Sequence, residues 1–279
     1  MVRATRDLRV ERGTVRAAGH DVVVVRLAPR SPVAPTAPPV VLVHGIGVSG
    51  RYFGPLAREL ARTGPVLVPD LPGFGASPRP DEPLGIADHA RVVSALVRDE
   101  GWSGVLLVGH SMGSQVVAEA AAADPGLASC VALLGPVTEP GARSAVRQGA
   151  RLLRDARHET LRANWAVLSD YVRTGPRWYL ATVPHMIDYR LEDRVAELTV
   201  PVLLVRGEHD PIAQPQYLAG LAARARDARV VEAPGSGHVV MMRRPREAAA
   251  VLRDLARTSV RGGAHDDVVR PAGGEERST

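Results

Sequence analysis

The sequence predicts a single α/β domain, built on a parallel or mostly parallel sheet with helices on both sides. Short apolar runs alternate along the chain with stretches of helical periodicity. Continuous apolar runs are typical of strands that are covered on both faces, and their alternation with helices indicates parallel crossover units. The alternation stops once, between Pro136 and about Arg194, where helical periodicity continues without a strand-like run. A chain of 279 residues suits one such domain with an insertion.

The expected strands are rich in β-branched and aliphatic residues, and turn-forming residues separate them from the helices. A proline-rich loop, 29–39, follows the first two strands and is too short to be a domain linker. Strands are expected at 8–15, 21–27, 40–43, 66–68, 105–108, 130–134, 202–205 and 230–231, and helices at 54–62, 88–99, 115–123 and 246–256.

The interruption after the sixth expected strand divides the chain into a core and an insertion. We expect residues 1–135 and 195–257 to form the core, and the helical insertion, 136–194, to sit over the sheet. The last residues, 258–279, combine glycine pairs with mixed charges and are expected to form a disordered tail.

Composition favours a globular protein and excludes several other classes. The apolar share of 45% supports a hydrophobic core, and no run approaches the roughly 20 apolar residues of a membrane-spanning helix. The stretch Met1–Glu11 is charged and lacks the apolar segment of a secretory signal, so a cytoplasmic protein is expected. The single cysteine, Cys130, excludes an intramolecular disulfide framework, and its apolar surroundings favour burial over reactivity.

The net charge of +5 does not indicate a nucleic-acid partner. Arginine supplies the positive charge, lysine is absent, and the arginines are scattered among acidic residues instead of forming a basic stripe. We therefore expect a small-molecule substrate, neither nucleic acid nor membrane as a partner, and a monomer or homodimer.

The strongest chemical signal is the serine in Gly109-His110-Ser111-Met112-Gly113. This G-x-S-x-G sequence follows an expected buried strand and precedes an expected helix, which is the context of a nucleophile elbow. The sharp turn requires glycines beside Ser111, projects its hydroxyl from the carboxyl edge of the sheet, and places the N-terminus of a helix beneath it. Ser111 is therefore the expected nucleophile.

A serine hydroxyl needs a general base that is oriented by a third group. In this arrangement an acid and then a histidine are expected after later strands. Asp210 follows the strand 202–205, and His238 lies in a glycine-rich loop after the strand 230–231. We assign Asp210 as the acid and His238 as the base, while Glu208 remains an alternative acid.

An oxyanion hole should complete the site. One donor is expected to be the backbone N–H of Met112, directly after the nucleophile, and the other to come from a loop after an earlier strand. The segment His44-Gly45-Ile46-Gly47 is at that place, and its glycines let the backbone approach a substrate. We expect Ile46 N–H to be the second donor and His44 to have a structural role.

Together these segments resemble the α/β-hydrolase family over residues 40 to about 255. The resemblance implies an eight-stranded sheet whose second strand alone is antiparallel, an insertion at 136–194 that is a cap domain, and no metal or organic cofactor. It also implies a structural role for the loop that begins at Asp70. The segments that carry it are His44–Gly47, Asp70–Ser77, Gly109–Gly113, Gly207–Pro211 and Gly237-His238.

Three residues distinguish between members of this family. Ser111 disfavours haloalkane dehalogenases and epoxide hydrolases, which resemble this chain but carry aspartate at the elbow. Val239 after the base disfavours carbon–carbon bond hydrolases, which usually carry tryptophan there, and His110 disfavours cofactor-free perhydrolases, which usually carry phenylalanine. We expect a serine hydrolase that cleaves an ester or related acyl bond of a small to medium soluble substrate. A perhydrolase, a carbon–carbon bond hydrolase, an acyltransferase or a non-catalytic ligand-binding or signalling protein remain alternatives.

Four aromatic residues of the insertion are candidates for substrate contacts, because the cap is where substrate choice should lie. Aromatic residues at helical spacing also form the core of a cap, so this second interpretation stays open. The four are Trp165, Tyr171, Trp178 and Tyr179.

Overall fold

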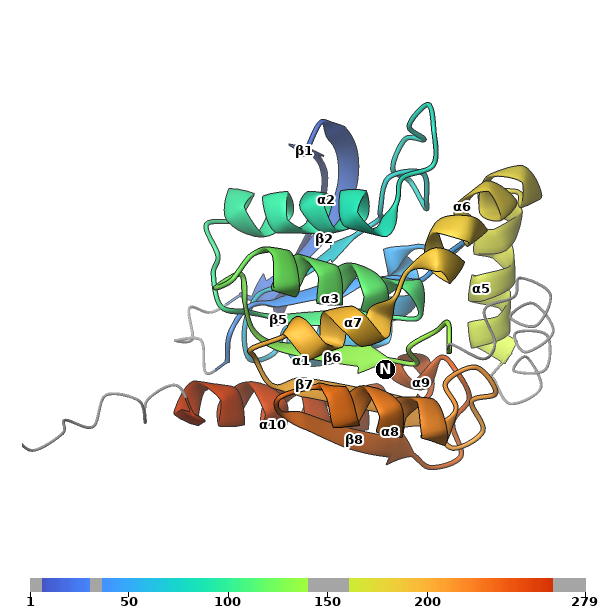
Figure 1. Ribbon diagram of the computed structural model, residues 1–279. Helices are drawn as coiled ribbons and strands as arrows, with labels where there is room; N and C mark the ends of the chain where they lie inside the picture. Colours follow the sequence, from blue (N-terminus) through green and yellow to red (C-terminus); the bar gives the residue numbers. More distant parts are fainter. Residues whose placement is uncertain (1–6, 31–36, 140–160, 263–279) are drawn as a thin grey trace, which may run out of the picture.

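The computed structural model describes residues 7–30, 37–139 and 161–262, which contain a central eight-stranded sheet (Figure 1). The strand order is β1-β2-β4-β3-β5-β6-β7-β8. β2 pairs antiparallel with β1 and β4, whereas the other neighbours are parallel, so β2 alone is reversed, as the resemblance implied. The strands are β1 (Leu8–Ala17), β2 (His20–Pro29), β3 (Val40–Val43), β4 (Val66–Pro69), β5 (Val105–His110), β6 (Ala128–Leu134), β7 (Val202–Gly207) and β8 (Ala228–Ala233).

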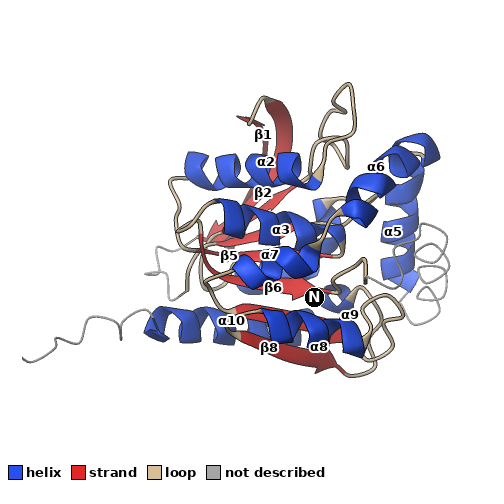
Figure 2. Ribbon diagram, in the orientation of Figure 1, coloured by secondary structure: helices blue, strands red, loops and turns tan. Residues whose placement is uncertain are grey.

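Helices cover both faces of the sheet (Figure 2). Since neighbouring side chains of a strand point to opposite faces, Leu107 of β5 joins the core on one face, while Leu106 and Val108 join the core on the other. The first face carries α2 (Ile86–Asp99), α3 (Met112–Ala123), α7 (Leu191–Glu197) and α8 (Pro215–Arg224), and the second carries α1 (Gly54–Leu60), α9 (Val240–Arg243) and α10 (Pro245–Gly262).

β5 lies in the middle of the sheet, between β3 and β6. Its residues Val105–Val108 are at most 1% exposed, which explains why the sequence shows a continuous apolar run here and no alternation. Because the strands on both sides are parallel to β5, the loops that follow β3, β5, β6, β7 and β8 all leave the sheet at the same edge. The chemically interesting residues of the sequence are in these loops.

The inserted helices α5 (Leu161–Thr174) and α6 (Pro176–Asp188) lie at this carboxyl edge (Figure 1). α5 packs against the short 3₁₀ helix η2 (Gly50–Phe53). The buried Asp170 of α5 accepts hydrogen bonds from the N–H (3.1 Å) and hydroxyl (2.7 Å) of Ser49 and pairs with Arg51 at 2.9 Å. Thr174 donates its hydroxyl to the Gly47 carbonyl at 2.9 Å. The end of α5 is therefore fastened to the loop that follows β3.

The limits of the insertion and of the tail differ in detail from the sequence prediction. The predicted boundary at Arg194 falls inside α7, which packs against α3 and α8. The predicted disordered tail from 258 was wrong for its first residues, because α10 continues to Gly262. There the hydroxyls of Thr258 and Ser259 bond carbonyls of the preceding turn. Residues 140–160 and 263–279 lie outside the described residues.

Two helices that pack on the sheet were not predicted. α8 follows the loop that carries Asp210 and has Pro215 in its first turn, and α9 follows His238. In the described ranges, no helix combines the length and apolar character that a membrane crossing requires.

The central position of β5 leads to a stability prediction. Leu107 of β5 is fully buried beneath the helices on its face of the sheet. Leu107→Ala should therefore lower the free energy of unfolding by about 3 kcal/mol, because the change removes apolar contacts and leaves a cavity. The matched control is Leu168→Ala on α5, whose side chain is 62% exposed, with an expected change below about 0.5 kcal/mol. Urea denaturation followed by circular dichroism measures both. Equal losses in the two variants would contradict the assigned core.

Candidate active site

Ser111 stands at the sharp turn between β5 and α3. Its backbone has φ 56° and ψ −123°, a conformation that residues with a Cβ rarely adopt. The Ser111 N–H donates to the Leu134 carbonyl at the end of β6 (2.9 Å), and the Ser111 carbonyl accepts from the Ser114 N–H (2.9 Å). Such a conformation costs on the order of 1–3 kcal/mol and persists where the surroundings hold it. Here the neighbouring strand and the first turn of α3 do so.

Gly109 and Gly113 are required because backbone segments pass very close to them. A Cβ on Gly109 would overlap the backbone of Gly113, and a Cβ on Gly113 would overlap the Val43 carbonyl at the end of β3. Backbone atoms cannot rotate away as a flexible side chain can. The two glycines of the G-x-S-x-G sequence therefore have a steric function in the packing of α3 against β3 and β5.

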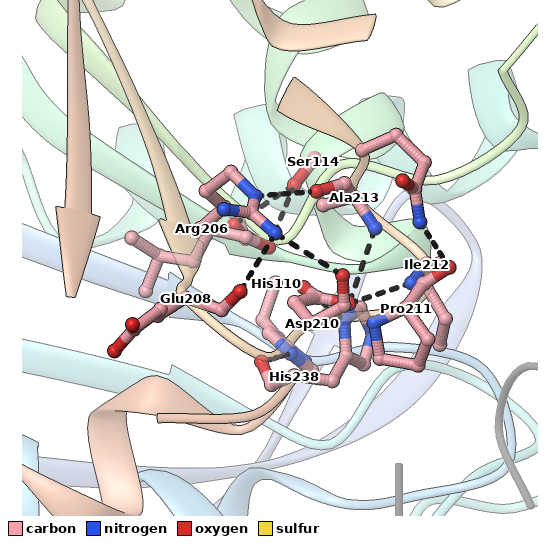
Figure 3. Close-up of polar contacts among 12 residues, drawn as sticks. His110, Ser114, Arg206, Glu208, Asp210, Pro211, Ile212, Ala213 and His238 are labelled. Carbon is pink, nitrogen blue, oxygen red and sulfur yellow. Dashed lines mark hydrogen bonds and ion pairs between the residues drawn. The ribbon is translucent and has the colours of Figure 1, made fainter. Parts of the chain in front are cut away.

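Asp210 and His238 form a buried hydrogen-bonded pair (Figure 3). The Asp210 Oδ2 lies 2.8 Å from the His238 Nδ1, and the two side chains are 0% and 4% exposed. The other carboxylate oxygen, Oδ1, accepts the N–H groups of Ile212 (2.8 Å) and Ala213 (3.1 Å). Burial by itself raises the pKa of Asp210, but the facing His238 and these N–H donors outweigh it and lower the pKa below its ordinary value. The carboxylate is therefore ionised at neutral pH.

Glu208, the alternative acid of the sequence analysis, points away from His238. Its side chain is 48% exposed, and its Oε2 accepts the Gly235 N–H at 2.7 Å. The geometry thus distinguishes two acidic residues that the sequence could not separate.

A buried arginine holds the loop that carries Asp210, and the sequence analysis did not single it out. Arg206, near the end of β7, donates to the carbonyls of Ala213 (2.8 Å), Glu208 (3.1 Å) and Asp210 (3.4 Å), and it pairs with Glu232 of β8. The only signal in the sequence is an arginine inside an otherwise apolar strand. Its guanidinium uses several donors at once, which makes the path of the loop specific (Figure 3).

The loop after β6 brings Ser111 and His238 to the same place. Gly135 follows Leu134, whose carbonyl binds the Ser111 N–H. A Cβ on Gly135 would lie 2.8 Å from two atoms of the His238 ring and 3.3 Å from the Asp210 Oδ2. The absence of a side chain at Gly135 therefore makes room for the Asp210–His238 pair near Ser111.

The loop after β3 approaches Ser111 from another direction. A Cβ on Gly45 would lie 2.9 Å from the Ser111 Cβ and 3.4 Å from its Oγ. Ile46, the next residue, is 6% exposed. Met112 is the first residue of α3, and an N–H at that position has no acceptor within its own helix. Both expected oxyanion donors thus belong to segments that adjoin the serine hydroxyl.

Three of the four aromatic residues predicted in the cap contact these loops. A Cβ on Gly47 would collide with the rings of Tyr171 and Tyr179, which pack against each other edge to face at 5.4 Å. A Cβ on Gly73, in the loop after β4, would lie 2.6 Å from Trp178. All three rings therefore cover the loops at the carboxyl edge.

Trp165 differs from the other three, because it is 70% exposed. Leu168 and Val172 share its face of α5 and are also exposed, whereas the opposite face, with Asp170 and Thr174, is buried. Three large apolar residues of this helix thus lie on its outer side, while the polar anchors Asp170 and Thr174 share the inner side with Val167 and Tyr171. Substrate contact by any of the four aromatic residues stays a prediction.

His44 joins two of the loops around the site. Its Nδ1 bonds the Gly45 carbonyl at 2.8 Å and therefore carries the proton, while its Nε2 accepts the Leu71 N–H at 2.9 Å. Both ring nitrogens are thus used in a structural role, connecting the loops after β3 and β4.

Three fully buried histidines, His44, His89 and His110, are neutral in the folded protein. Burial is the largest cause in each case: it lowers the pKa of His44 and His110 and lowers that of His89 to about 3. The neighbouring His238 further lowers the pKa of His110. Among the described residues, neither ring nitrogen of His89 has a hydrogen-bond partner.

Comparison with known proteins identifies the family. Residues 40–251 match the sequence profile of the Alpha/beta hydrolase family, and the chain therefore belongs to that family. The fold agrees with this assignment, since an esterase from Thermogutta terrifontis superposes with a TM-score of 0.73 at 20% identity, over 89% of this chain and 99% of the esterase.

Two relatives show what enzymes of similar sequence do. Lipase LipV of Mycobacterium tuberculosis is 28% identical over 263 residues, which cover 84% of this chain and 97% of the lipase. The 2-(acetamidomethylene)succinate hydrolase of Mesorhizobium japonicum is 27% identical over 230 residues, covering 74% of this chain and 83% of that enzyme. These similarities fit a hydrolase of the α/β family.

The buried histidines predict acid sensitivity. Their folded pKa values lie below the unfolded value of about 6.5, so unfolding takes up protons below that pH and stability rises with pH. Their contribution to the free energy of unfolding is fully present above pH 6.5 and is lost as the pH falls. For His89 this loss continues down to its folded-state pKa of about 3. Each fully titrating histidine adds about 1.4 kcal/mol per pH unit.

Urea denaturation at pH 7.5, 6.0 and 5.0 measures this dependence. The free energy of unfolding should fall steeply below pH 6.5, and His89→Leu should fall less steeply, because one of the three titrating groups is gone. An identical slope in the variant would rule out His89 as a contributor.

Proposed function

We propose that this protein is a serine hydrolase that cleaves an ester or related acyl bond through an acyl-enzyme. The observation that carries the proposal is the buried Asp210–His238 pair beside the strained turn at Ser111. The proposed nucleophile Ser111, orienting acid Asp210 and base His238 follow one another in the chain order that the family uses. The fold and the hydrolase relatives support the reaction class.

In the proposed first step, the Ser111 Oγ attacks the carbonyl carbon of the substrate while His238 Nε2 takes the hydroxyl proton. Asp210 accepts the Nδ1–H of His238 at 2.8 Å, which leaves Nε2 as the basic nitrogen and stabilises the imidazolium that forms. The lowered pKa of Asp210 keeps it ionised throughout, so the acid acts by orientation and charge and does not take the proton itself.

The oxyanion that develops on the substrate is proposed to accept the N–H groups of Met112 and Ile46. Removing one such donor typically costs about 10²- to 10³-fold in rate, because the donors are aimed at charge that develops only in the transition state. His238 then protonates the leaving alcohol, and water, activated by the same histidine, hydrolyses the acyl-enzyme.

A small to medium soluble substrate is proposed for the space under the cap. The support is the contact of Tyr171 and Tyr179 with the loop after β3, which also adjoins Ser111, and of Trp178 with the loop after β4. An ester is favoured because the relatives include a lipase and an esterase.

The nucleophile is tested by covalent labelling. A fluorophosphonate probe should modify Ser111 in the wild-type protein, and peptide mapping identifies the labelled residue. Ser111→Ala should lose labelling and lower ester hydrolysis by about 10⁴-fold or more. A panel of p-nitrophenyl esters from acetate to decanoate supplies the best substrate for this comparison. Unchanged turnover in Ser111→Ala, with an unchanged melting temperature, would refute the proposal.

A matched pair of variants tests the acid. Asp210→Asn should lower kcat by about 10⁴-fold, because the amide can no longer hold His238 in the required tautomer. Glu208→Gln should change kcat less than about threefold, since the Gln carbonyl oxygen can still accept the Gly235 N–H. Steady-state kinetics on the best p-nitrophenyl ester measures both. The reverse ranking would assign the acid to Glu208.

A further inference from the structure

A chain of buried hydrogen bonds connects the three loops around Ser111. The Gly45 N–H donates to the Tyr52 hydroxyl oxygen at 3.0 Å, the same oxygen lies 2.8 Å from the His110 Nδ1, and the His110 Nε2 lies 3.0 Å from the His238 carbonyl oxygen. Tyr52 is 2% exposed, and His110 and His238 are each 3% exposed. The chain is therefore shielded from water along its whole length.

The chemistry of its members gives this chain a single direction. A carbonyl oxygen only accepts, so the His110 Nε2 must carry a proton for its bond to His238. Burial lowers the pKa of His110 well below its ordinary value, so the ring is neutral and its Nδ1 is an acceptor. Tyr52, whose pKa burial raises, keeps its proton and donates to that Nδ1. Its oxygen then accepts the Gly45 N–H, and each donor has one acceptor.

The two ends of the chain are the parts that the proposed reaction needs in place. Gly45 precedes Ile46 and lies against the Ser111 side chain. His238 is the proposed base, and His110 directly precedes the nucleophile. The rings are also in contact: Tyr52 and His110 meet edge to face with centroids 5.4 Å apart, and the tilted rings of His110 and His238 have centroids 4.6 Å apart.

We propose that Tyr52 and His110 are positioning residues. Their hydrogen-bond chain holds two loops in place around Ser111: the loop after β3, which carries the expected oxyanion donor Ile46, and the loop after β8, which carries the proposed base His238. This proposal rests on the proposed serine hydrolase function. Neither residue reacts with substrate. Tyr52 fixes where Gly45 and Ile46 lie, and His110 fixes the backbone of His238, so the loss of either displaces a catalytic group.

The kinetic test uses Tyr52→Phe, His110→Phe and the double variant. Tyr52→Phe keeps the ring and removes only the hydroxyl. We expect kcat per active site, counted by fluorophosphonate titration, to fall about tenfold or more, since small misplacements of catalytic groups have large effects. KM should change by less than about threefold, because the chain acts on reacting groups and not on ground-state binding. His110→Gln, whose carboxamide can still donate to the His238 carbonyl, should recover most of what His110→Phe loses.

The double variant separates one shared chain from two independent packing effects. Both single changes interrupt the same chain, so the double variant should be no slower than the slower single variant. The control is Tyr189→Phe, which removes a part-buried hydroxyl that binds Glu119 at 2.7 Å on the far part of α3, and it should keep kcat per active site. Tyr52→Phe behaving like Tyr189→Phe, or losses that multiply in the double variant, would overturn the proposal.

The tautomer of His110 is tested without any activity. Long-range ¹H–¹⁵N NMR of the wild-type protein at pH 7 should find His110 neutral with its proton on Nε2. A charged ring, or a proton on Nδ1, would overturn the chain even if Ser111 is the nucleophile. Conversely, a missing fluorophosphonate label on Ser111 would refute the proposed function, while the tautomer would still decide whether the chain exists.

Discussion

At Ser111 the backbone takes a positive φ of 56°, and the surrounding structure is arranged to keep it there. Gly109 and Gly113 let the start of α3 approach β5 and the end of β3 without steric overlap. Hydrogen bonds to Leu134 on one side and Ser114 on the other hold the turn. These contacts require β3, β5 and β6 to be adjacent and parallel, so a single constraint sets both the strand order of the sheet and the position of Ser111.

The polar groups around this turn are buried in a largely apolar sheet edge, where an unpaired polar group is costly. Asp210 is ionised there because three donors face it, whereas His44 and His110 avoid charge by staying neutral and using both ring nitrogens. The buried Arg206 is satisfied by three carbonyls and Glu232. Because nearly every group has a partner of the right kind, the loops have few alternative arrangements.

The inserted helices α5 and α6 are held to the same region by polar and aromatic contacts. Asp170 and Thr174 bind Ser49 and Gly47 of the loop after β3, and Tyr171 and Tyr179 close over Gly47. The loop after β3 is thus contacted on one side by α5 and on the other by the Tyr52 hydroxyl. A change in the position of α5 or α6 would act directly on this loop, which physically links the inserted helices to the geometry around Ser111.

The sequence alone determined the α/β class and the strands, because apolar runs and turn residues are local signals. It also predicted Ser111, Asp210 and His238 as the candidate site, because strand ends mark the edge of the sheet at which such residues meet. Tertiary structure decided the rest. Asp210 and Glu208 both follow β7, and only the loop path held by Arg206 turns one of them to His238. Helical periodicity indicated which residues of α5 share a face, but only the tertiary contacts of Asp170 showed that its side of the helix faces inward and that Trp165 lies outside. The partners of Tyr52 are distant in the chain, so no local pattern indicated them.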